Sequence, residues 1–440
     1  MIKNRFIKNT AWIIFGQVFR MLVSLVIGII TARYLGPSNN GVIHYVSSYI
    51  AFFTAIIGLG LSGVIVHEFV TNREEEGKIL GTAIWLRFIV GVISLFAFMG
   101  MIILIEGNDQ TIILVALLQA IQMPFNCFDT INYWYQSHMK SKYSVISQNI
   151  AYVVIVIYRI IMLVTEKDVV WFAFGVSLDV IVLSVSYLIF YSRHKTKKLG
   201  YSKAIAKRLL TGCLPFILAN IMVVIYAQMD RIMIKHLMGS TEEVGLYSAA
   251  ITICGFISLI PIAILDSGRP LISEAKLESE EKYKLRFKQL AAGIIWTCVL
   301  YSAFITLFSR IIIYLLYGED YLGADVCLKI AVWYTSFSYL GSARSFWLIC
   351  EDKKKYVFVF SLIGAICNVI MNFAFIPIWG INGAAIATLI TQILANFVVP
   401  LMFKQTREYG KLVIDAVLLK DIQLKDMISL VLKRFKIKKQ

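Results

Sequence analysis

The chain alternates long apolar stretches with short polar ones from one end to the other. A helix needs about 20 apolar residues to cross the roughly 30 Å hydrocarbon core of a bilayer. Stretches of this kind predict crossings at Thr10–Arg33, Val42–Val66, Ile79–Leu104, Thr111–Trp134, Ser144–Val164, Val169–Phe190, Leu209–Lys235, Val244–Asp266, Leu290–Tyr314, Asp325–Ile349, Val357–Trp379 and Gly383–Phe403. The pattern therefore predicts an all-α, polytopic membrane protein with about 12 transmembrane helices.

Polar residues interrupt these crossings in a regular way. In Thr111–Trp134 they recur at i, i+3, i+7, i+10 and i+14, a spacing that puts them on one helical face. The positions are Gln119, Gln122, Asn126, Asp129 and Tyr133. Other crossings carry further polar positions at Gln17, Asn220, Gln228, Asn368 and Asn372. Because such groups cannot face lipid, they must line protein or water, and we expect them to line a polar cavity.

A long basic loop, residues 192–208, divides the crossings into two six-helix halves, 1–191 and 209–403. The junctions that follow the first crossing of each half resemble one another, since each runs from a cation through Leu and Gly to a second Gly and a Tyr. They occupy Arg33–Tyr45 and Lys235–Tyr247. Six crossings per half predict two parallel repeats around a central cavity. The tail 404–440 predicts a basic amphipathic helix on the inner leaflet, with a disordered end as the alternative.

Composition and charge placement agree with a membrane protein. Hydrophobic residues make up 59% of the 440 residues and charged residues only 16%, against about 25% in soluble domains. The net charge of +16 could indicate nucleic acid, but most of the 43 Lys and Arg fall in the alternate loops and the two termini. This bias predicts that both termini are cytoplasmic, and it argues against a nucleic-acid partner.

Metal and disulfide chemistry are not indicated. The seven cysteines are scattered singly, without a CxxC pair, and the five histidines lie in or near the predicted loops without HExxH spacing. We therefore expect no metal and no cofactor.

Ionisable residues inside the crossings need an explanation, because each costs about 2.5–3.5 kcal/mol to insert. The arginines are Arg20, Arg87, Arg159, Arg231 and Arg344, and the acids that could couple transport to an ion are Asp129 and Asp179. Each could instead be structural, pairing with another helix or reaching an interface, most readily Arg87 and Arg344. Since arginines outnumber acids, we predict a cationic cavity that binds an anion through these arginines, because guanidinium groups match phosphate oxygens.

Both ends of the chain carry motifs that resemble a known family. The N-terminal motif is Lys8–Trp12 with Thr31–Pro37 and Gly41, and the C-terminal motif is Asn368–Asn372, Ile376–Pro377 and Trp379–Thr388. Together they are similar to the polysaccharide repeat-unit flippases (Wzx type) of the multidrug, oligosaccharidyl-lipid and polysaccharide exporter superfamily. The resemblance covers nearly the whole chain.

This resemblance implies a transporter rather than an enzyme. It would flip a polyprenyl-pyrophosphate-linked oligosaccharide repeat unit from the inner to the outer leaflet of the bacterial cytoplasmic membrane, for synthesis of a surface polysaccharide such as O-antigen. The implied partners are the anionic lipid-linked glycan, the bilayer and the polysaccharide polymerase or assembly machinery.

Three alternatives stay open. One is a cation-coupled drug or organic-cation antiporter of the same superfamily, and another is a membrane scaffold without transport. The third is a glycan-polymerising enzyme, which the short predicted outer loops, such as Glu106–Gln110, argue against.

Overall fold

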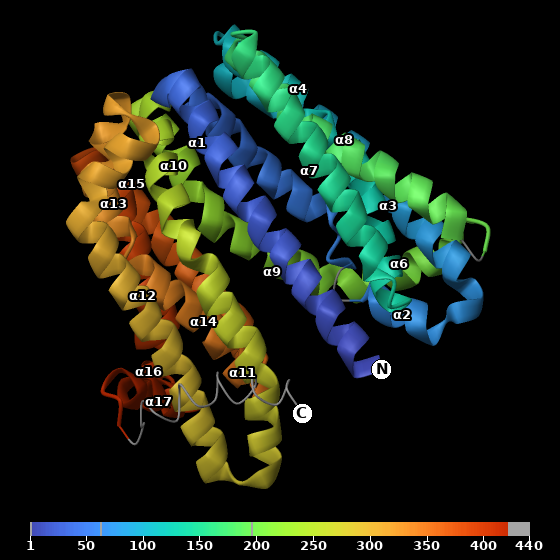
Figure 1. Cartoon of the computed structure of the whole chain (residues 1–440), viewed down its shortest axis with the longest axis vertical. Helices are drawn as coiled ribbons and strands as arrows, with labels where there is room; N and C mark the ends of the chain where they lie inside the picture. The colour runs from blue at the N-terminus through green and yellow to red at the C-terminus, as the bar shows by residue number, and fades with distance from the viewer. Residues whose placement is uncertain (1, 62–63, 195–196, 421–440) are drawn as a thin grey trace. The chain divides into compact units, whose positions relative to one another are not determined.

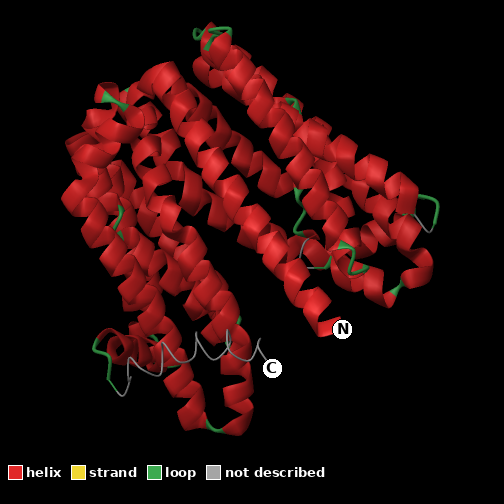
Figure 2. Ribbon diagram, in the orientation of Figure 1, coloured by secondary structure: helices red, strands yellow, loops and turns green. Residues whose placement is uncertain are grey.

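The structure is a computed structural model, which describes residues 2–61, 64–194 and 197–420, without the side chains of residues 2–22, 214–216, 218–219 and 226. In this part of the chain the regular structure is helical throughout (Figure 2). The α-helices are α1 (Ile2–Ile57), α2 (Ile65–Thr71), α3 (Glu76–Glu106), α4 (Gln110–Ala120), α5 (Gln122–Phe125), α6 (Thr130–Ser137), α7 (Ser141–Val164), α8 (Val169–His194), α9 (Lys203–Met238), α10 (Thr241–Gly255), α11 (Leu259–Glu278), α12 (Glu280–Tyr317), α13 (Asp325–Ala331), α14 (Tyr334–Cys350), α15 (Lys355–Ile393), α16 (Val399–Met402) and α17 (Arg407–Val417). Short 3₁₀ segments and one π-helical segment, Leu394–Val398, connect several of them.

The prediction of a polytopic all-α membrane protein is confirmed. Among the described residues, eight helical stretches are long and apolar enough to cross a bilayer, from Val23–Ile57 to Lys355–Met402. Two of the helices contain a break, at Gly36 in α1 and at Gly380 in α15, where φ is +71° and +57°. Each of these two helices therefore holds one predicted crossing and the first part of the next.

One predicted crossing ends earlier than its apolar pattern suggests. The prediction was Val42–Val66, but the helix stops at Ile57, and Leu59 and Gly60 both have positive φ. The sequence stays apolar beyond the end of the helix. The reason is that Leu59, Leu61 and Ile65 are buried in a hydrophobic cluster with Phe69. Hydrophobicity alone could not place the end, since buried turn residues in a membrane protein are as apolar as helical ones.

The described helices form two compact units. The first contains Met1–Ile232 and Ser240–Gly245, and the second contains Met233–Gly239 and Leu246–Gln440. In the first, α8 packs against α7 and α4, and α1 packs against α3, α4 and α7 (Figure 1). In the second, α12 packs against α11, α14 and α17. The predicted division of the chain into two six-helix repeats at 192–208 stays a prediction. The contacts between residues assign α9 to the first unit as far as Ile232.

The predicted amphipathic tail is described as far as Lys420. Helix α17 buries Tyr409, Leu412 and Val413 in the core of the second unit. On its polar side, Lys284 Nζ of α12 lies 2.6 Å from Glu408 Oε1. The prediction of an amphipathic tail rests on apolar positions spaced between lysines. All of these positions but Leu418 lie outside the described residues; they are Ile422, Met427, Val431 and Phe435.

Parts of the two similar junctions, residues 37–41 and Ser240–Gly245, contact each other within the first unit. Gly36 ends the first limb of α1 and Gly239 follows α9, and both have a φ of +71°, which glycine adopts without strain. Beyond them, a Cβ on Gly41 would collide with the carbonyl of Thr241, and one on Gly245 would collide with the carbonyl of Pro37. The contact is reciprocal, as between two copies of one motif. The second glycine of each motif is therefore required for close backbone packing.

A candidate anion-binding cluster

A polar cluster lies on the second limb of α1. His44, Ser47 and Ser48 are spaced i, i+3 and i+4, so that they share one face of the helix. The hydroxyl of Ser48 donates to the carbonyl of His44 at 2.8 Å. Other helices of the first unit meet this face with polar side chains, as follows.

Helix α4 contributes Gln119, which is fully buried. Its Oε1 accepts a hydrogen bond from Ser47 Oγ at 2.9 Å, and its Nε2 donates to the carbonyl of Ile43 at 3.3 Å. The side chain therefore bridges α4 to α1 with donor and acceptor both satisfied. The prediction that Gln119 lines a polar cavity stays a prediction.

Helix α9 contributes Gln228 and Arg231, which lie one turn apart. Gln228 Oε1 accepts from Ser48 Oγ at 3.2 Å and from Arg231 Nη1 at 2.8 Å. The shared acceptor positions the guanidinium of Arg231 beside α1. Both side chains are only partly buried.

Helix α7 contributes a second guanidinium, that of Arg159, which is also partly exposed. The charge of Arg159 interacts with Asp179 on α8, whose side chain is exposed. An exposed carboxylate on a lipid-embedded helix has to face a polar space. The charges of both Arg159 and Arg231 interact with His44. We call His44, Ser47, Ser48, Gln119, Arg159, Gln228 and Arg231 the His44 cluster.

Arg87 is placed differently from these arginines. It is 5% exposed on α3, where its Nε donates to the carbonyl of Ile57 at 3.1 Å and its Nη1 donates to Thr130 Oγ1 at 2.9 Å. Asp129 adds a charge interaction with this guanidinium. We call Arg87, Ile57, Asp129 and Thr130 the Arg87 tie. It joins the end of α1 to α3 and to the start of α6, which favours the structural interpretation of Arg87.

Arg344 is also buried, in the second unit. Its Nη1 donates to the carbonyl of Ala395 in the π-helical segment, and its guanidinium lies 5.2 Å from the ring centre of Phe360. Asn368 and Asn372 are fully buried on α15, where Asn372 Nδ2 donates to Asn368 Oδ1 at 3.1 Å. Asn368 Nδ2 in turn donates to Thr388 Oγ1, beyond the break at Gly380, at 3.4 Å. These groups join helices of the second unit.

The remaining predicted positions fall into three groups. The side chains of Gln17 and Arg20 lie outside the described residues. Asn220 is exposed on α9. Gln122 and Asn126 hydrogen-bond to the carbonyls of their own helical segment, at Gln119 and Gln122, near Pro124. That proline has no N–H to donate, and a 3₁₀ segment, Asn126–Asp129, follows it, so these amides serve an irregular stretch of helix.

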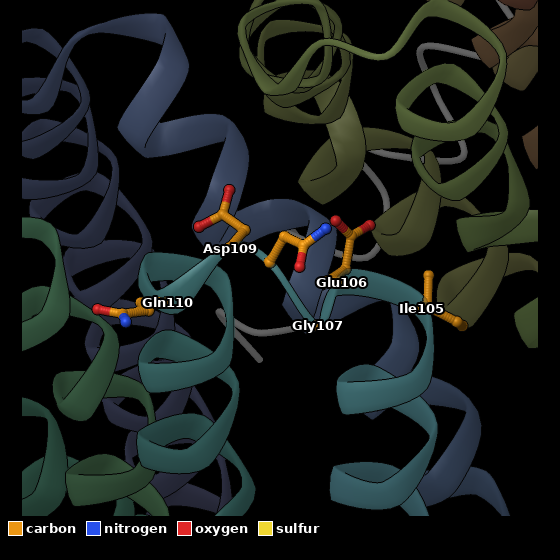
Figure 3. A pocket seen from close by; sticks show the side chains of 6 residues that line it. Ile105, Glu106, Gly107, Asp109 and Gln110 are labelled. Atoms are coloured by element: carbon orange, nitrogen blue, oxygen red, sulfur yellow. The ribbon is translucent and has the colours of Figure 1, made fainter.

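A separate polar hollow lies at the turn between α3 and α4. It has a volume of about 590 Å³ and is lined by residues Ile105 to Gln110. Figure 3 shows Glu106 and Asp109 on the same side of the turn. Both carboxylates already have partners, because Glu106 accepts from Tyr45 Oη at 2.7 Å and Asp109 caps α4 through the amide of Ile112 at 3.0 Å. The hollow is acidic, and we do not assign the anion to it.

The sequence analysis missed His44, Ser47 and Ser48. It placed the histidines in or near loops, but His44 lies inside a continuous limb of α1. A signal was available, since His44 falls within the predicted crossing Val42–Val66 and ionisable residues inside crossings usually have a function.

Apolar helices of crossing length with hydrogen-bonded polar groups between them define a polytopic membrane protein. Comparisons with known proteins support this class. A sequence profile described as polysaccharide biosynthesis protein matches residues 6–276, and a second, MatE, matches residues 215–374. The first match spans more than half of the chain. The protein therefore belongs to the polysaccharide biosynthesis protein family, which confirms the resemblance to the polysaccharide branch of the exporter superfamily.

Individual relatives agree with this assignment. The capsular polysaccharide biosynthesis protein CapF of Staphylococcus aureus is 24% identical over 408 residues, covering 88% of this chain and 97% of CapF. The lipid II flippase MurJ, in an inward closed conformation, shares the fold with a TM-score of 0.73 at 15% identity, over 97% of this chain and 96% of MurJ. An inward-facing multidrug resistance transporter of the MATE family has a TM-score of 0.68 at 16% identity, over 91% and 96%.

Proposed function

We propose that the protein flips a polyprenyl-diphosphate-linked oligosaccharide repeat unit from the inner to the outer leaflet of the bacterial cytoplasmic membrane. Both termini would lie in the cytoplasm, and a polysaccharide polymerase or assembly machinery would receive the flipped unit. The family and the shared flippase fold support lipid-linked transport. No bond of the cargo needs to be made or broken.

The observation that carries this proposal is the pair of partly exposed guanidinium groups in the His44 cluster. Arg159 and Arg231 lie on different helices, and the charges of both interact with His44. Guanidinium groups bind phosphate oxygens through paired, charge-assisted hydrogen bonds, which are stronger in a partly buried site than in water. The amide and hydroxyl groups of Gln228 and Ser48 lie beside them and could hydrogen-bond to sugar hydroxyls. An organic cation would be repelled from the same site.

The experiment is transport into vesicles that contain the purified full-length protein. One set contains a fluorescent polyprenyl-diphosphate oligosaccharide, a second contains the same glycan on a neutral lipid, and a third is given an organic cation. A membrane-impermeant reagent reports how much of the glycan changes leaflet.

We expect protein-dependent movement of the diphosphate-linked glycan, little movement of the neutral glycolipid, and no uptake of the cation. Cation uptake without glycan movement would favour the antiporter alternative. Equal movement of the charged and neutral glycolipids would remove the role of the anion.

A further inference from the structure

Helix α17 has two faces, and the second unit covers only one of them. The covered face carries buried residues at i, i+3, i+4 and i+7. They are Tyr409, Leu412, Val413 and Ala416. The hydroxyl of Tyr409 donates to the carbonyl of Leu340 on α14 at 3.3 Å, and its ring packs against that of Trp347 on the same helix. These contacts give α17 a defined orientation beside α12 (Figure 1).

The opposite face of α17 is exposed and combines cations with apolar residues. Its positions follow i, i+4, i+7 and i+11, so they share one side of the helix. They are Arg407, Lys411, Ile414 and Leu418, the last of which directly follows α17. Val417 lies at the edge of this side, and the exposed fractions of Ile414, Val417 and Leu418 are 39%, 41% and 70%. We call Arg407, Lys411, Ile414, Val417 and Leu418 the outer face of α17.

The charged residues of α17 differ in exposure. Its acids, Glu408 and Asp415, are seven residues apart, so they form a strip along one flank of the helix. Both are partly buried, and Glu408 is paired with Lys284 of α12. Arg407 and Lys411 are exposed, although Arg407 Nε also donates to the carbonyl of Leu401 at 3.2 Å. The charge that the outer face presents is therefore positive.

The outer face continues the exposed apolar surface of the last candidate span. That span, Lys355–Met402, ends at Met402, which is 71% exposed. Helix α17 begins at Arg407, and five residues reach at most about 18 Å, so it lies close to the end of the span. Apolar residues beside cations are typical of helices that lie in the headgroup region of a membrane. The bilayer is therefore the partner whose chemistry fits the outer face.

We propose that the outer face of α17 binds anionic lipid headgroups, those of the inner leaflet if both termini are cytoplasmic. Ile414, Val417 and Leu418 enter the boundary between headgroups and acyl chains, and Arg407 and Lys411 bind the lipid phosphates. The attraction between these cations and an anionic surface weakens as salt screens it. The inference concerns the lipid around the protein and does not depend on which cargo it transports.

The experiment is photo-cross-linking of the full-length protein in phosphatidylcholine nanodiscs. One sample contains a trace of photoactivatable phosphatidylglycerol, and another contains photoactivatable phosphatidylcholine with the same acyl chains. After illumination, mass spectrometry of peptides measures how much of the segment 402–420 each lipid has labelled. We expect both lipids to label it, with phosphatidylglycerol favoured on the order of threefold to tenfold at low salt. High salt should reduce this preference.

The double variant Arg407→Gln/Lys411→Gln should lose the preference for phosphatidylglycerol. It should keep its labelling by phosphatidylcholine, because the apolar residues of the outer face are unchanged. The matched control is Lys282→Gln/Lys354→Gln, which removes two exposed cations elsewhere in the second unit. This control should label as the wild type does.

Three results would overturn the proposal. If neither lipid labels α17, another part of the chain or another protein covers the outer face. Equal labelling of the wild type by the two lipids would show that the outer face does not select anionic headgroups. A preference that survives in the double variant would show that other cations bind them. The preference of the wild type and its loss at high salt need no variant, so they decide the question even if the double variant does not fold.

Discussion

The His44 cluster and the Arg87 tie lie in the same unit, and both place guanidinium groups in helices that cross the membrane, but they use these groups differently. Arg87 is buried and its hydrogen bonds go to the Ile57 carbonyl and the Thr130 hydroxyl. Arg231 is partly exposed and has a side-chain amide as its partner. The guanidinium of Arg87 therefore joins helices, whereas in the proposed function that of Arg231 binds the anion.

The two arginines differ because different hydrogen-bond acceptors lie beside their guanidinium groups. At the Arg87 tie, α1 has just ended, and the guanidinium satisfies a carbonyl that the helix can no longer satisfy. At the His44 cluster the helices continue, so their backbone groups are already paired. There the hydroxyl of Ser48 and Nη1 of Arg231 both donate to a side-chain acceptor, Gln228 Oε1. Burial and partner type thus separate the two kinds of arginine.

The largest expected effect is on transport when a cluster arginine loses its charge. Arg231→Gln, and separately Arg159→Gln, should lower flipping of the diphosphate-linked glycan on the order of tenfold to a hundredfold, because a charge-assisted hydrogen bond contributes about 1.5–3 kcal/mol. The leaflet assay in vesicles measures this effect. The thermal unfolding midpoint should change little, and a large drop in that midpoint would mean that these residues are structural.

Arg87→Gln should show the opposite behaviour. Its loss leaves the Ile57 carbonyl without its side-chain donor in a buried place, at a cost of about 1–3 kcal/mol. We expect less folded protein and a lower thermal midpoint, with normal flipping per folded molecule. Thr130→Val provides a milder comparison, since it removes the hydroxyl contact and keeps the carbonyl contact. A stable Arg87→Gln variant that fails to flip would place Arg87 with the cargo-binding residues.

Substitution of the junction glycines measures how much their close packing stabilises the limb of α1 that carries His44. Gly41→Ala or Gly245→Ala should destabilise the protein by about 1–3 kcal/mol, because each Cβ would meet a backbone carbonyl that cannot move aside easily. The double variant should cost less than the sum, because both changes open the same contact.

Gly100→Ala on α3 is the matched control, because nothing lies within 4 Å of its added Cβ, and it should be neutral or slightly stabilising. Denaturation of the three variants in one detergent gives the comparison. A Gly41→Ala variant as stable as Gly100→Ala would contradict the close contact.

The smallest expected effect is on stability, when an ion pair at a helix end is removed. The effects of the other variants can be compared with it. Lys276 Nζ lies 2.7 Å from Glu351 Oε1. Burial raises the pKa of the Glu351 carboxyl, but the hydrogen bond and charge of Lys276 outweigh burial and hold this pKa below its usual value. The pair therefore stabilises the fold above the usual pKa of glutamate, and the contribution is lost as the pH falls through the lowered value.

Lys276→Gln should narrow the difference in thermal midpoint between neutral and acidic pH. A midpoint that depends on pH equally in both proteins would show that the pair contributes nothing measurable.

Much of the fold could be predicted from the sequence. Apolar length gave the helical, membrane-spanning class, and the similar junctions gave positions that the structure brings together at Gly41 and Gly245. These features are encoded locally, in the order of residues along one helix.

The partners of the polar residues could not be predicted in the same way. Periodicity gives the face of a helix but not its neighbour, so the acceptors of Arg87 and Arg231 could not be predicted. The end of α1 at Ile57 was hidden by apolar residues that are buried in a turn. His44 was missed because it was grouped with the loop histidines, and only its charge interactions with two arginines on other helices distinguish it.

The most direct test of the account is binding of a short-chain prenyl-diphosphate monosaccharide to the Arg159→Gln/Arg231→Gln double variant in nanodiscs. Arg193→Gln, which removes one exposed guanidinium from the end of α8, is the control for loss of charge. The account predicts that the double variant folds but loses measurable binding, while Arg193→Gln binds as the wild type does. Wild-type affinity in the folded double variant would contradict the assignment of the anion to the His44 cluster.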